Sequence, residues 1–347
     1  MEENARVTGV SRGYIAHHIL ELDGIRGIAI LLVMIGHSWP RLSLLAVSGV
    51  GLFFVLSGFL ITRILVSNVG KPYYFRNFYT RRALRIWPLY YLILGITFLT
   101  PIFSFSHTEF PSCRFLLYIQ NFWPLDKAPP ILGTTWSLAI EEQFYLVWPL
   151  LVWFCRTPRR VWWLAMFLIA ITPAIRINYY LAGVDSYALT LGRLDGLATG
   201  AALSVLIMCW SGNSERRSRL IAICLAISIS LLPLLHFTFL RKAFKDTSAN
   251  LFFGCLLAFS VYWSGSRGTR ILRTAVLRFF GKISYCAYLV HLALIYRLGT
   301  FPVVVRLAIT ILIATASWYL FERPILRLKD FFTRVDVTTP KVTVGAY

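Results

Sequence analysis

The chain has 347 residues, of which 57% are hydrophobic, 16% aromatic and only 14% charged. This composition excludes a soluble globular protein, because apolar stretches of about 20 residues, long enough to span a bilayer, recur from one end to the other. The net charge of +20 does not indicate a nucleic-acid partner, because the basic residues cluster in the short breaks between apolar stretches. The six cysteines include no C-x-x-C pair and indicate neither a disulfide framework nor a metal site.

Ten hydrophobic stretches are predicted to span the membrane as helices, so the expected fold is an all-α polytopic bundle. They lie near 24–41, 46–67, 84–104, 135–155, 161–182, 190–210, 220–240, 248–263, 279–298 and 301–321. The stretch 114–123 is an ambiguous eleventh. If it does not span, most loop Lys and Arg residues are cytoplasmic, whereas a spanning helix would place more of them outside than inside. The charge pattern therefore favours ten spans, with 105–134 as an external or re-entrant segment.

This topology places both termini in the cytoplasm. The predicted N-terminal tail, transmembrane domain and C-terminal tail are residues 1–21, 22–324 and 325–347. Lys127 and Tyr187 are then expected outside, and Arg159 and Arg217 in the cytoplasm. The expected location is the bacterial inner membrane.

The first span carries Asp23, Arg26 and His37 within an otherwise apolar run. Charge inside a membrane span is costly and usually functional. The 11-residue step from Arg26 to His37 returns to nearly the same helix face and separates the two by about 16 Å along the axis. We expect an anionic ligand near Arg26 and chemistry further in, at His37. Asp23, one turn before Arg26, is expected to neutralise it.

Other spans also contain or adjoin charged residues. Arg82 and Arg85 lie on one face at the cytoplasmic start of the third span, where they can hold phosphates or serve only as positive-inside residues. Glu141 and Glu142 lie inside the fourth span. Neighbouring helix residues point about 100° apart, so at most one of these carboxylates can lie at the centre of a site.

Some polar residues are interpreted as structural. Arg193 and Asp195 are expected to form an intramembrane pair, and His291 to be a packed, hydrogen-bonded helix residue rather than a second base. Ser57 and Gly58 lack the second glycine of a G-x-S-x-G motif, so they indicate close helix packing rather than a nucleophile.

Seven motifs resemble, in the same order, those of the acyltransferase 3 family of integral membrane acyltransferases. They read LDGIRGIAILLVMIGHS, VGLFFVLSGFLIT, FYTRRALRIWPLYY, TTWSLAIEEQFYL, GRLDGLATGAAL, ISYCAYLVHL and FERP. The resemblance implies ten helices around a site that transfers an acyl group, commonly acetyl from acetyl-CoA, to a hydroxyl of a carbohydrate or lipid-linked glycan. It implies that Arg26 and His37 are essential and that Arg82 and Arg85 serve the CoA side. The SGNH hydrolase-like domain that many members carry at the C-terminus is expected to be absent.

The chemistry of acyl transfer agrees with this resemblance. A neutral imidazole can take the proton of an acceptor hydroxyl as its oxygen attacks a thioester carbonyl, and His37 is the candidate base. Glu141 or Glu142 is the candidate carboxylate that orients its ring, and spacing does not choose between them. Arg26, Arg82 and Arg85 would form a basic mouth for the phosphates of acyl-CoA. Acyl-CoA is the expected co-substrate, and no metal is expected.

The expected partners are membrane lipids and the carbohydrate or lipid-linked glycan acceptor, and the oligomeric state stays open. A secondary transporter or flippase is the alternative function, since it would also use intramembrane charges. It predicts related halves, and no convincing repeat links 22–155 with 190–324. A non-catalytic scaffold would not need buried His, Arg and Glu. A different membrane acyltransferase family would place its marker histidine in a later span.

Overall fold

The computed structural model describes residues 19–99, 113–122, 130–209, 214–230 and 238–332. These residues form helices and turns without any strand, which confirms the all-α fold. The long helices are α1 (Leu20–Ser38), α2 (Ser43–Asn68), α3 (Tyr74–Leu99), α5 (Thr135–Cys155), α6 (Pro158–Leu181), α7 (Leu194–Cys209), α8 (Ser214–Ser230), α9 (Thr238–Tyr262), α10 (Ala275–Arg297) and α11 (Val303–Ser317). Each of the ten predicted stretches overlaps mainly with one of them, although the limits differ: α9 begins at Thr238 rather than near 248, and α8 ends at Ser230 rather than near 240.

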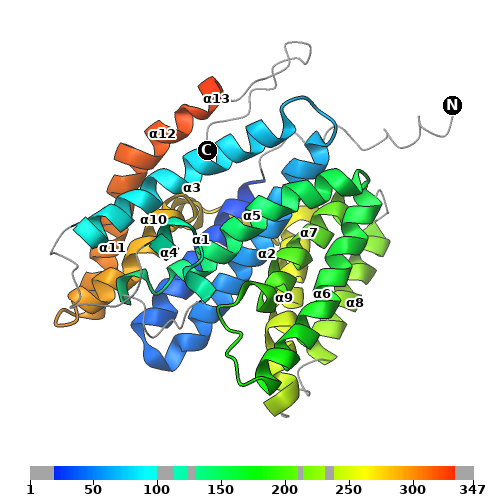
Figure 1. The fold of residues 1–347 in the computed structure, drawn as a ribbon, viewed down its shortest axis with the longest axis horizontal. Helices are drawn as coiled ribbons and strands as arrows, with labels where there is room; N and C mark the ends of the chain where they lie inside the picture. The colour runs from blue at the N-terminus through cyan, green and yellow to red at the C-terminus, as the bar shows by residue number, and fades with distance from the viewer. Residues whose placement is uncertain (1–18, 100–112, 123–129, 210–213, 231–237, 333–347) are drawn as a thin grey trace.

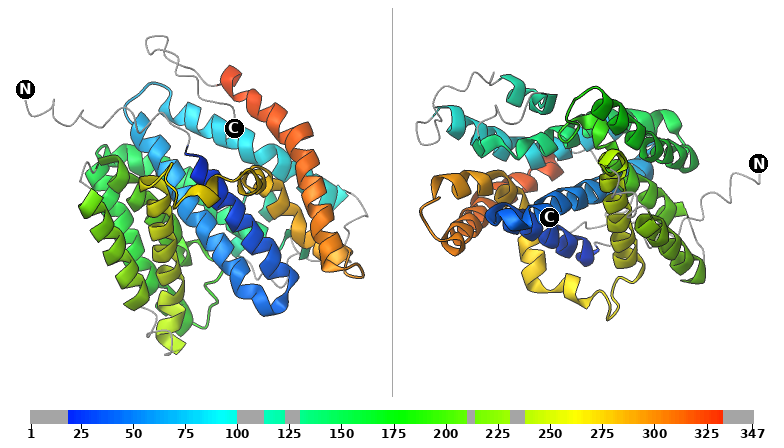
Figure 2. Two further views of the ribbon diagram at one scale, coloured as in Figure 1. Left: turned by 180° about the vertical axis from the view of Figure 1, so that it is seen from behind. Right: turned by 90° about the horizontal axis from the view of Figure 1, so that it is seen from below.

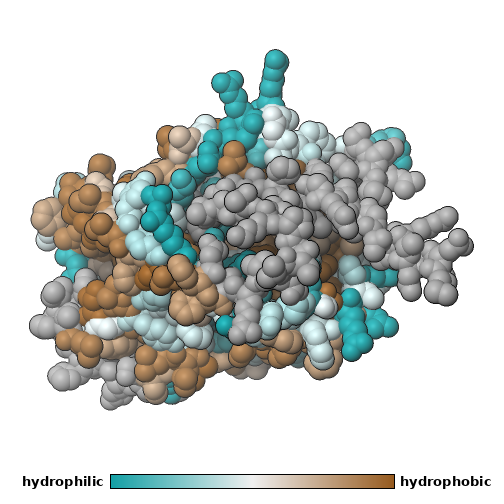
Figure 3. Space-filling model, turned by 90° about the horizontal axis from the view of Figure 1, so that it is seen from above, coloured by the Kyte–Doolittle hydropathy of each residue, from teal (hydrophilic) through white to brown (hydrophobic). Residues whose placement is uncertain are grey.

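Within the described part of the chain, six helical segments are long and apolar enough to cross a membrane by length and composition. They are Pro40–Asn68, Tyr74–Leu99, Thr135–Cys155, Pro158–Leu181, Ala275–Arg297 and Val303–Arg327. Large apolar side chains lie exposed on the outside of the bundle, among them Phe154 and Leu320, and hydrophobic residues occupy much of the rim in Figure 3. Because such a surface is suited to lipid rather than water, the chain is a multi-pass membrane protein.

The ambiguous stretch 114–123 contains no spanning helix in its described part. Residues 113–122 form the four-residue α4 (Cys113–Leu116) and a 3₁₀ turn, Gln120–Phe122. Tyr90 of α3 donates a hydrogen bond to the carbonyl of Phe115, which ties this segment to the bundle. The rest of 105–134 lies partly outside the described residues, so its external or re-entrant position stays a prediction.

The bundle has a central part and two flanks (Figure 1). Helices α1, α2 and α5 lie in the middle, α6 to α9 on one side, and α3 and α10 to α13 on the other (Figures 1 and 2). The chain leaves α11 through a π-helical turn (Trp318–Glu322) into α12 (Arg323–Arg327) and α13 (Lys329–Phe332). The α2–α3 and α5–α6 connections lie at the same end as α13, and the α1–α2 and α10–α11 connections at the opposite end.

Glycines allow the central helices to approach closely. A Cβ atom at Gly27 of α1 would fall on the carbonyl oxygen of Leu277 and 3.2 Å from the backbone nitrogen of Gly281, both in α10. A Cβ at Gly58 of α2 would fall on the carbonyl of Leu197 in α7. Small residues let membrane helices pack at this distance, so the packing interpretation of Gly58 is confirmed.

The interpretation of Arg193 and Asp195 is correct in its structural role and wrong in the partners. Arg193 forms an ion pair with Asp246 of α9 at 2.9 Å, and Asp195 with Arg176 of α6 at 2.6 Å. Arg193 lies in the turn just before α7, whereas Asp195 lies in its first turn, and the two side chains meet different neighbours. The two ion pairs join α6, α7 and α9.

The predicted topology can be tested on α6. Arg159 lies in its first turn, and Tyr187 lies in the segment that connects its last residue, Leu181, to α7. Both side chains are exposed, whereas Lys127 and the side chain of Arg217 lie outside the described part. In a background without native cysteines, an impermeant thiol reagent added outside is expected to label Tyr187→Cys and not Arg159→Cys. Labelling of Arg159→Cys from outside would contradict the ten-span topology.

Candidate active site

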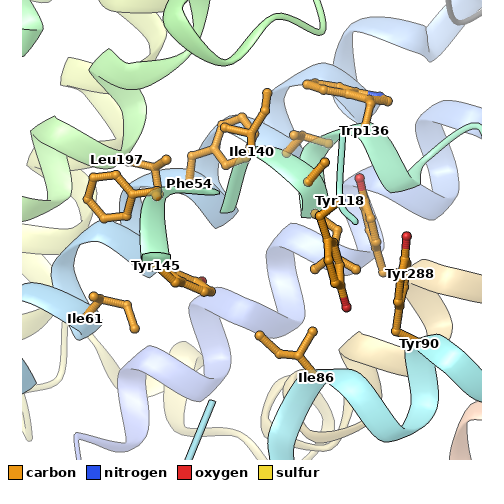
Figure 4. Close-up of a cluster of buried hydrophobic side chains, with 14 of the residues drawn as sticks. Phe54, Ile61, Ile86, Tyr90, Tyr118, Trp136, Ile140, Tyr145, Leu197 and Tyr288 are labelled. Carbon is orange, nitrogen blue, oxygen red and sulfur yellow. The ribbon is translucent and has the colours of Figure 1, made fainter. Parts of the chain in front are cut away.

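An inner cavity of about 110 Å³ lies among α1, α2, α3, α5 and α10. Its polar lining includes Arg26, Ser57, Arg82, Arg85, Glu141 and Tyr145. Four of the lining residues appear in Figure 4, each from a different helix: Phe54, Ile86, Tyr145 and Tyr288. The structure therefore brings together the predicted arginines and one of the two predicted glutamates.

Glu141 is the carboxylate at this cavity. Ser57 Oγ donates to its Oε1 atom at 3.1 Å, and Tyr145 OH donates to its Oε2 atom at 2.9 Å. The guanidinium of Arg82 lies over the Tyr145 ring, 5.6 Å from its centre. Ser57 thus has a polar role beside the packing role of its neighbour Gly58.

Glu142 points elsewhere. Its Oε2 atom accepts a hydrogen bond from Trp87 Nε1 at 3.0 Å, and it does not line the inner cavity. This confirms that only one of the adjacent carboxylates occupies the centre, as the 100° step between neighbouring helix residues requires. Neither carboxylate is hydrogen-bonded to His37 within the described residues, so the geometry selects Glu141 for the cavity but not as the partner of His37.

An outer cavity of about 260 Å³ adjoins the inner one. The two share Arg26, Arg85, Ser284 and Tyr285 as lining residues. Six basic residues line the outer cavity: Arg26, Arg85, Lys282, Arg323, Arg327 and Lys329. Among the described residues, the acidic side chains that accompany them are Asp23 and Glu322. The excess of positive charge makes this mouth suited to a polyanion.

Sequence reasoning missed part of this mouth. Arg323 and Arg327 were interpreted only as loop charge, although FERP was noted as a motif, and Lys282 within the predicted span 279–298 was not singled out. A π-helical turn at Trp318–Glu322 precedes Arg323 and Arg327, and such turns often occur at functional sites. Arg26 pairs with Asp23 at 3.3 Å, as predicted. Within the described residues, Arg85 has no ion pair.

His37 lies at the last turn of α1 and contacts a second histidine. Its Nδ1 atom is 3.1 Å from Nε2 of His291 in α10, and the ring centres are 5.1 Å apart. His291 is fully buried and hydrogen-bonded to carbonyls of its own helix, as predicted for a packed histidine. The contact with His37 was not foreseen. The structure gives His37 a histidine partner where the sequence indicated a carboxylate.

Tyr288 stands between the inner cavity and the histidine pair. It lines the cavity, and its ring lies 5.8 Å from that of His291, one helical turn further along α10. Its hydroxyl is 2.5 Å from Ser137 Oγ and donates to the carbonyl of Thr134 at 3.1 Å. Along α1 and α10, the basic outer cavity is therefore followed by the inner cavity and then by the histidine pair.

Residues 19–322 match the family of acyltransferase domains designated Acyl_transf_3. The chain belongs to this acyltransferase family. The matched region contains the whole inner cavity and both histidines, while Arg323, Arg327 and Lys329 of the outer cavity follow it. Among the described residues, no group of three or more His, Cys, Asp or Glu side chains could hold a metal ion.

Curated relatives of this acyltransferase are bacterial. The peptidoglycan O-acetyltransferase OatA of Listeria monocytogenes is 28% identical over 369 residues, which cover 92% of this chain and 57% of that protein. The O-acetyltransferase OatA of Staphylococcus aureus (strain NCTC 8325 / PS 47) is 27% identical over 363 residues, covering 92% and 58%. The chain spans little more than half the length of these relatives. No solved structure matches it.

Proposed function

We propose that this chain transfers an acetyl group from cytoplasmic acyl-CoA to a carbohydrate hydroxyl of the bacterial cell envelope. The observation that carries the proposal is the basic outer cavity that leads through the inner cavity toward the His37–His291 pair. Membership of the acyltransferase family supports the reaction type. The names of the relatives support an acetyl group and a peptidoglycan-like acceptor.

The donor would bind from the basic end. Phosphates are held best by charge-assisted hydrogen bonds from guanidinium and ammonium groups, and the outer cavity offers six such side chains. The inner cavity, of about 110 Å³, has room for the acyl end of the donor and not for its nucleotide. Arg26 and Arg85 line both cavities and would hold the donor where they join.

The acceptor would arrive from the opposite end, where α1 ends at His37. Its hydroxyl oxygen attacks the thioester carbonyl while His37 takes the hydroxyl proton. The C–S bond then breaks, the acyl group stays on the acceptor oxygen, and the CoA thiolate recovers a proton from the imidazolium. Each turnover releases one free CoA thiol for every ester formed, and His37 returns to its neutral form.

The test is an acyl-transfer assay on the purified chain in lipid vesicles, with isotope-labelled acetyl-CoA and soluble peptidoglycan fragments. We expect the label on the glycan, as an ester, and an equal release of CoA thiol. Glycan transport across the vesicle membrane without consumption of acetyl-CoA would overturn the proposal and favour the transporter alternative.

On the donor side, Arg82→Ala and Arg85→Ala are expected to raise the KM for acyl-CoA more than the KM for the acceptor. A lost charge-assisted contact with the donor costs about 1.5–3 kcal/mol of binding. Steady-state kinetics with each substrate varied in turn measures the difference. Arg81→Ala is the matched control, because Arg81 is exposed, adjacent in sequence and does not line either cavity. If all three variants changed the KM for acyl-CoA equally, Arg82 and Arg85 would have a role in membrane topology alone.

A further inference from the structure

We propose that His291 is a positioning residue that orients His37 with a bare Nε2 atom and stabilises its protonated form. This inference rests on the proposed function, in which His37 is the base. The sequence indicated a glutamate for this role, and the structure places a neutral imidazole there instead.

The partners of His291 assign its tautomer. Its Nδ1 atom lies 2.8 Å from the carbonyl oxygen of Tyr288 and 3.1 Å from that of Ala287. Carbonyl oxygens only accept hydrogen bonds, so Nδ1 of His291 carries a hydrogen. The ring is fully buried in a membrane bundle, where a charged imidazolium is costly. In the neutral ring Nε2 is therefore an acceptor.

That acceptor in turn assigns His37. Nδ1 of His37 lies 3.1 Å from Nε2 of His291 and 3.1 Å from the carbonyl oxygen of Val33, one turn earlier on α1. Both neighbours accept, so Nδ1 of His37 carries a hydrogen and donates. The neutral ring then has its lone pair on Nε2, and no described residue hydrogen-bonds to that atom. The free nitrogen is the one that can take a proton.

The packing of α1 against α10 explains why the two rings meet. Gly27 and Gly281 lie against each other where these helices touch. From Gly27 to His37 is a step of ten residues along α1, and from Gly281 to His291 is the same step along α10. Since the two helices run in the same direction from this contact, equal steps reach the same level of the bundle. The close approach at the glycines thus sets the contact at the histidines.

This arrangement has a chemical consequence. When Nε2 of His37 takes a proton, the ring becomes an imidazolium and its bond from Nδ1 to His291 becomes charge-assisted, which is shorter and stronger than a neutral bond. The bond to Val33 alone would leave the ring without a partner from a second helix. A neutral acceptor also avoids a buried carboxylate beside the base, which the membrane interior disfavours.

The test compares two substitutions of similar size in the acyl-transfer assay. His291→Leu removes the acceptor and fills the space, while His291→Gln keeps an amide that can accept from His37 and donate to a carbonyl. We expect kcat to fall about 10- to 100-fold in His291→Leu, as for a lost charge-assisted bond, with both KM values little changed. We expect His291→Gln to recover most of this loss. A folded His291→Leu protein with normal kcat would overturn the inference.

Two further variants separate positioning from packing and from failure of the proposed function. Adding His291→Leu to His37→Ala is expected to cause no further loss, because residues that act as a unit are not additive. Thr310→Val, which removes a buried hydroxyl bonded to a carbonyl of its own helix, controls for general loss of polar contacts. A normal rate in His37→Ala would refute His37 as the base. Loss in His37→Ala with none in His291→Leu would refute only this inference.

Discussion

His37→Ala is expected to abolish acyl transfer while the protein still inserts into the membrane and binds acyl-CoA. A positioned general base contributes about 10²- to 10⁴-fold to the rate, and His37 lies at the far end of α1 from the arginines of the donor mouth. Turnover of acetyl-CoA and equilibrium binding of CoA, measured on the same preparation, test the two halves of this expectation.

Ser38→Ala is the matched control for that experiment. Ser38 is the next residue of the same helix turn, is buried, and its hydroxyl has no hydrogen-bond partner within the described residues. Its removal is expected to leave turnover near normal. Retained turnover in His37→Ala, with normal insertion, would refute the mechanism. Loss of CoA binding in the same variant would show that the whole site depends on His37 rather than the proton transfer alone.

Arg176→Met is expected to cause the largest loss of stability among single substitutions outside the site. The Arg176 side chain is buried, pairs with Asp195 at 2.6 Å, and donates to the carbonyls of Gly192 and Ala243 and to Thr247. Removing one partner of a buried ion pair leaves an uncompensated charge and costs about 3–5 kcal/mol. Thermal unfolding of the detergent-solubilised protein measures the effect as a lowered Tm.

Two comparisons make this second result decisive. The double variant Arg176→Met with Asp195→Leu is expected to recover much of the lost Tm, because replacing both charges by apolar groups is far less costly than removing one. Arg219→Met breaks an ion pair with Glu215 that is largely exposed and is expected to change Tm little. Equal Tm values for Arg176→Met and Arg219→Met would show that the buried ion pair does not stabilise the packing of α6 against α7 and α9.

The sequence alone identified most of the candidate site. Arg26 and His37 were recognisable because charged and titratable groups inside an apolar run are costly, and the helical period placed them on one face. The same period showed that Glu141 and Glu142 could not both be central. Which of the two faces the cavity depends on the rotation of α5 against its neighbours, a quantity that no local pattern contains.

The contact between His37 and His291 shows where sequence reasoning ended. The two residues are 254 positions apart, and each by itself looks like an interfacial or packed helix histidine. Their meeting depends on the glycine contact between α1 and α10, which becomes visible only when the two helices are placed together. The partners of Arg193 and Asp195 were missed for the same reason, since both come from other helices.

The division between what the sequence determines and what only the tertiary structure determines has a simple physical basis. The approximate positions of the apolar helices, the polar residues within them and the family resemblance are local properties, because hydrophobic length and helical period are written along the chain. Tertiary structure alone decided the pairs across helices: the ion pairs of α7, the joined cavities and the histidine contact. In a membrane, association of helices depends on close steric fit and specific polar contacts rather than on burial of apolar surface. Such a fit is a joint property of two helix surfaces, so it becomes visible only when the helices have packed together.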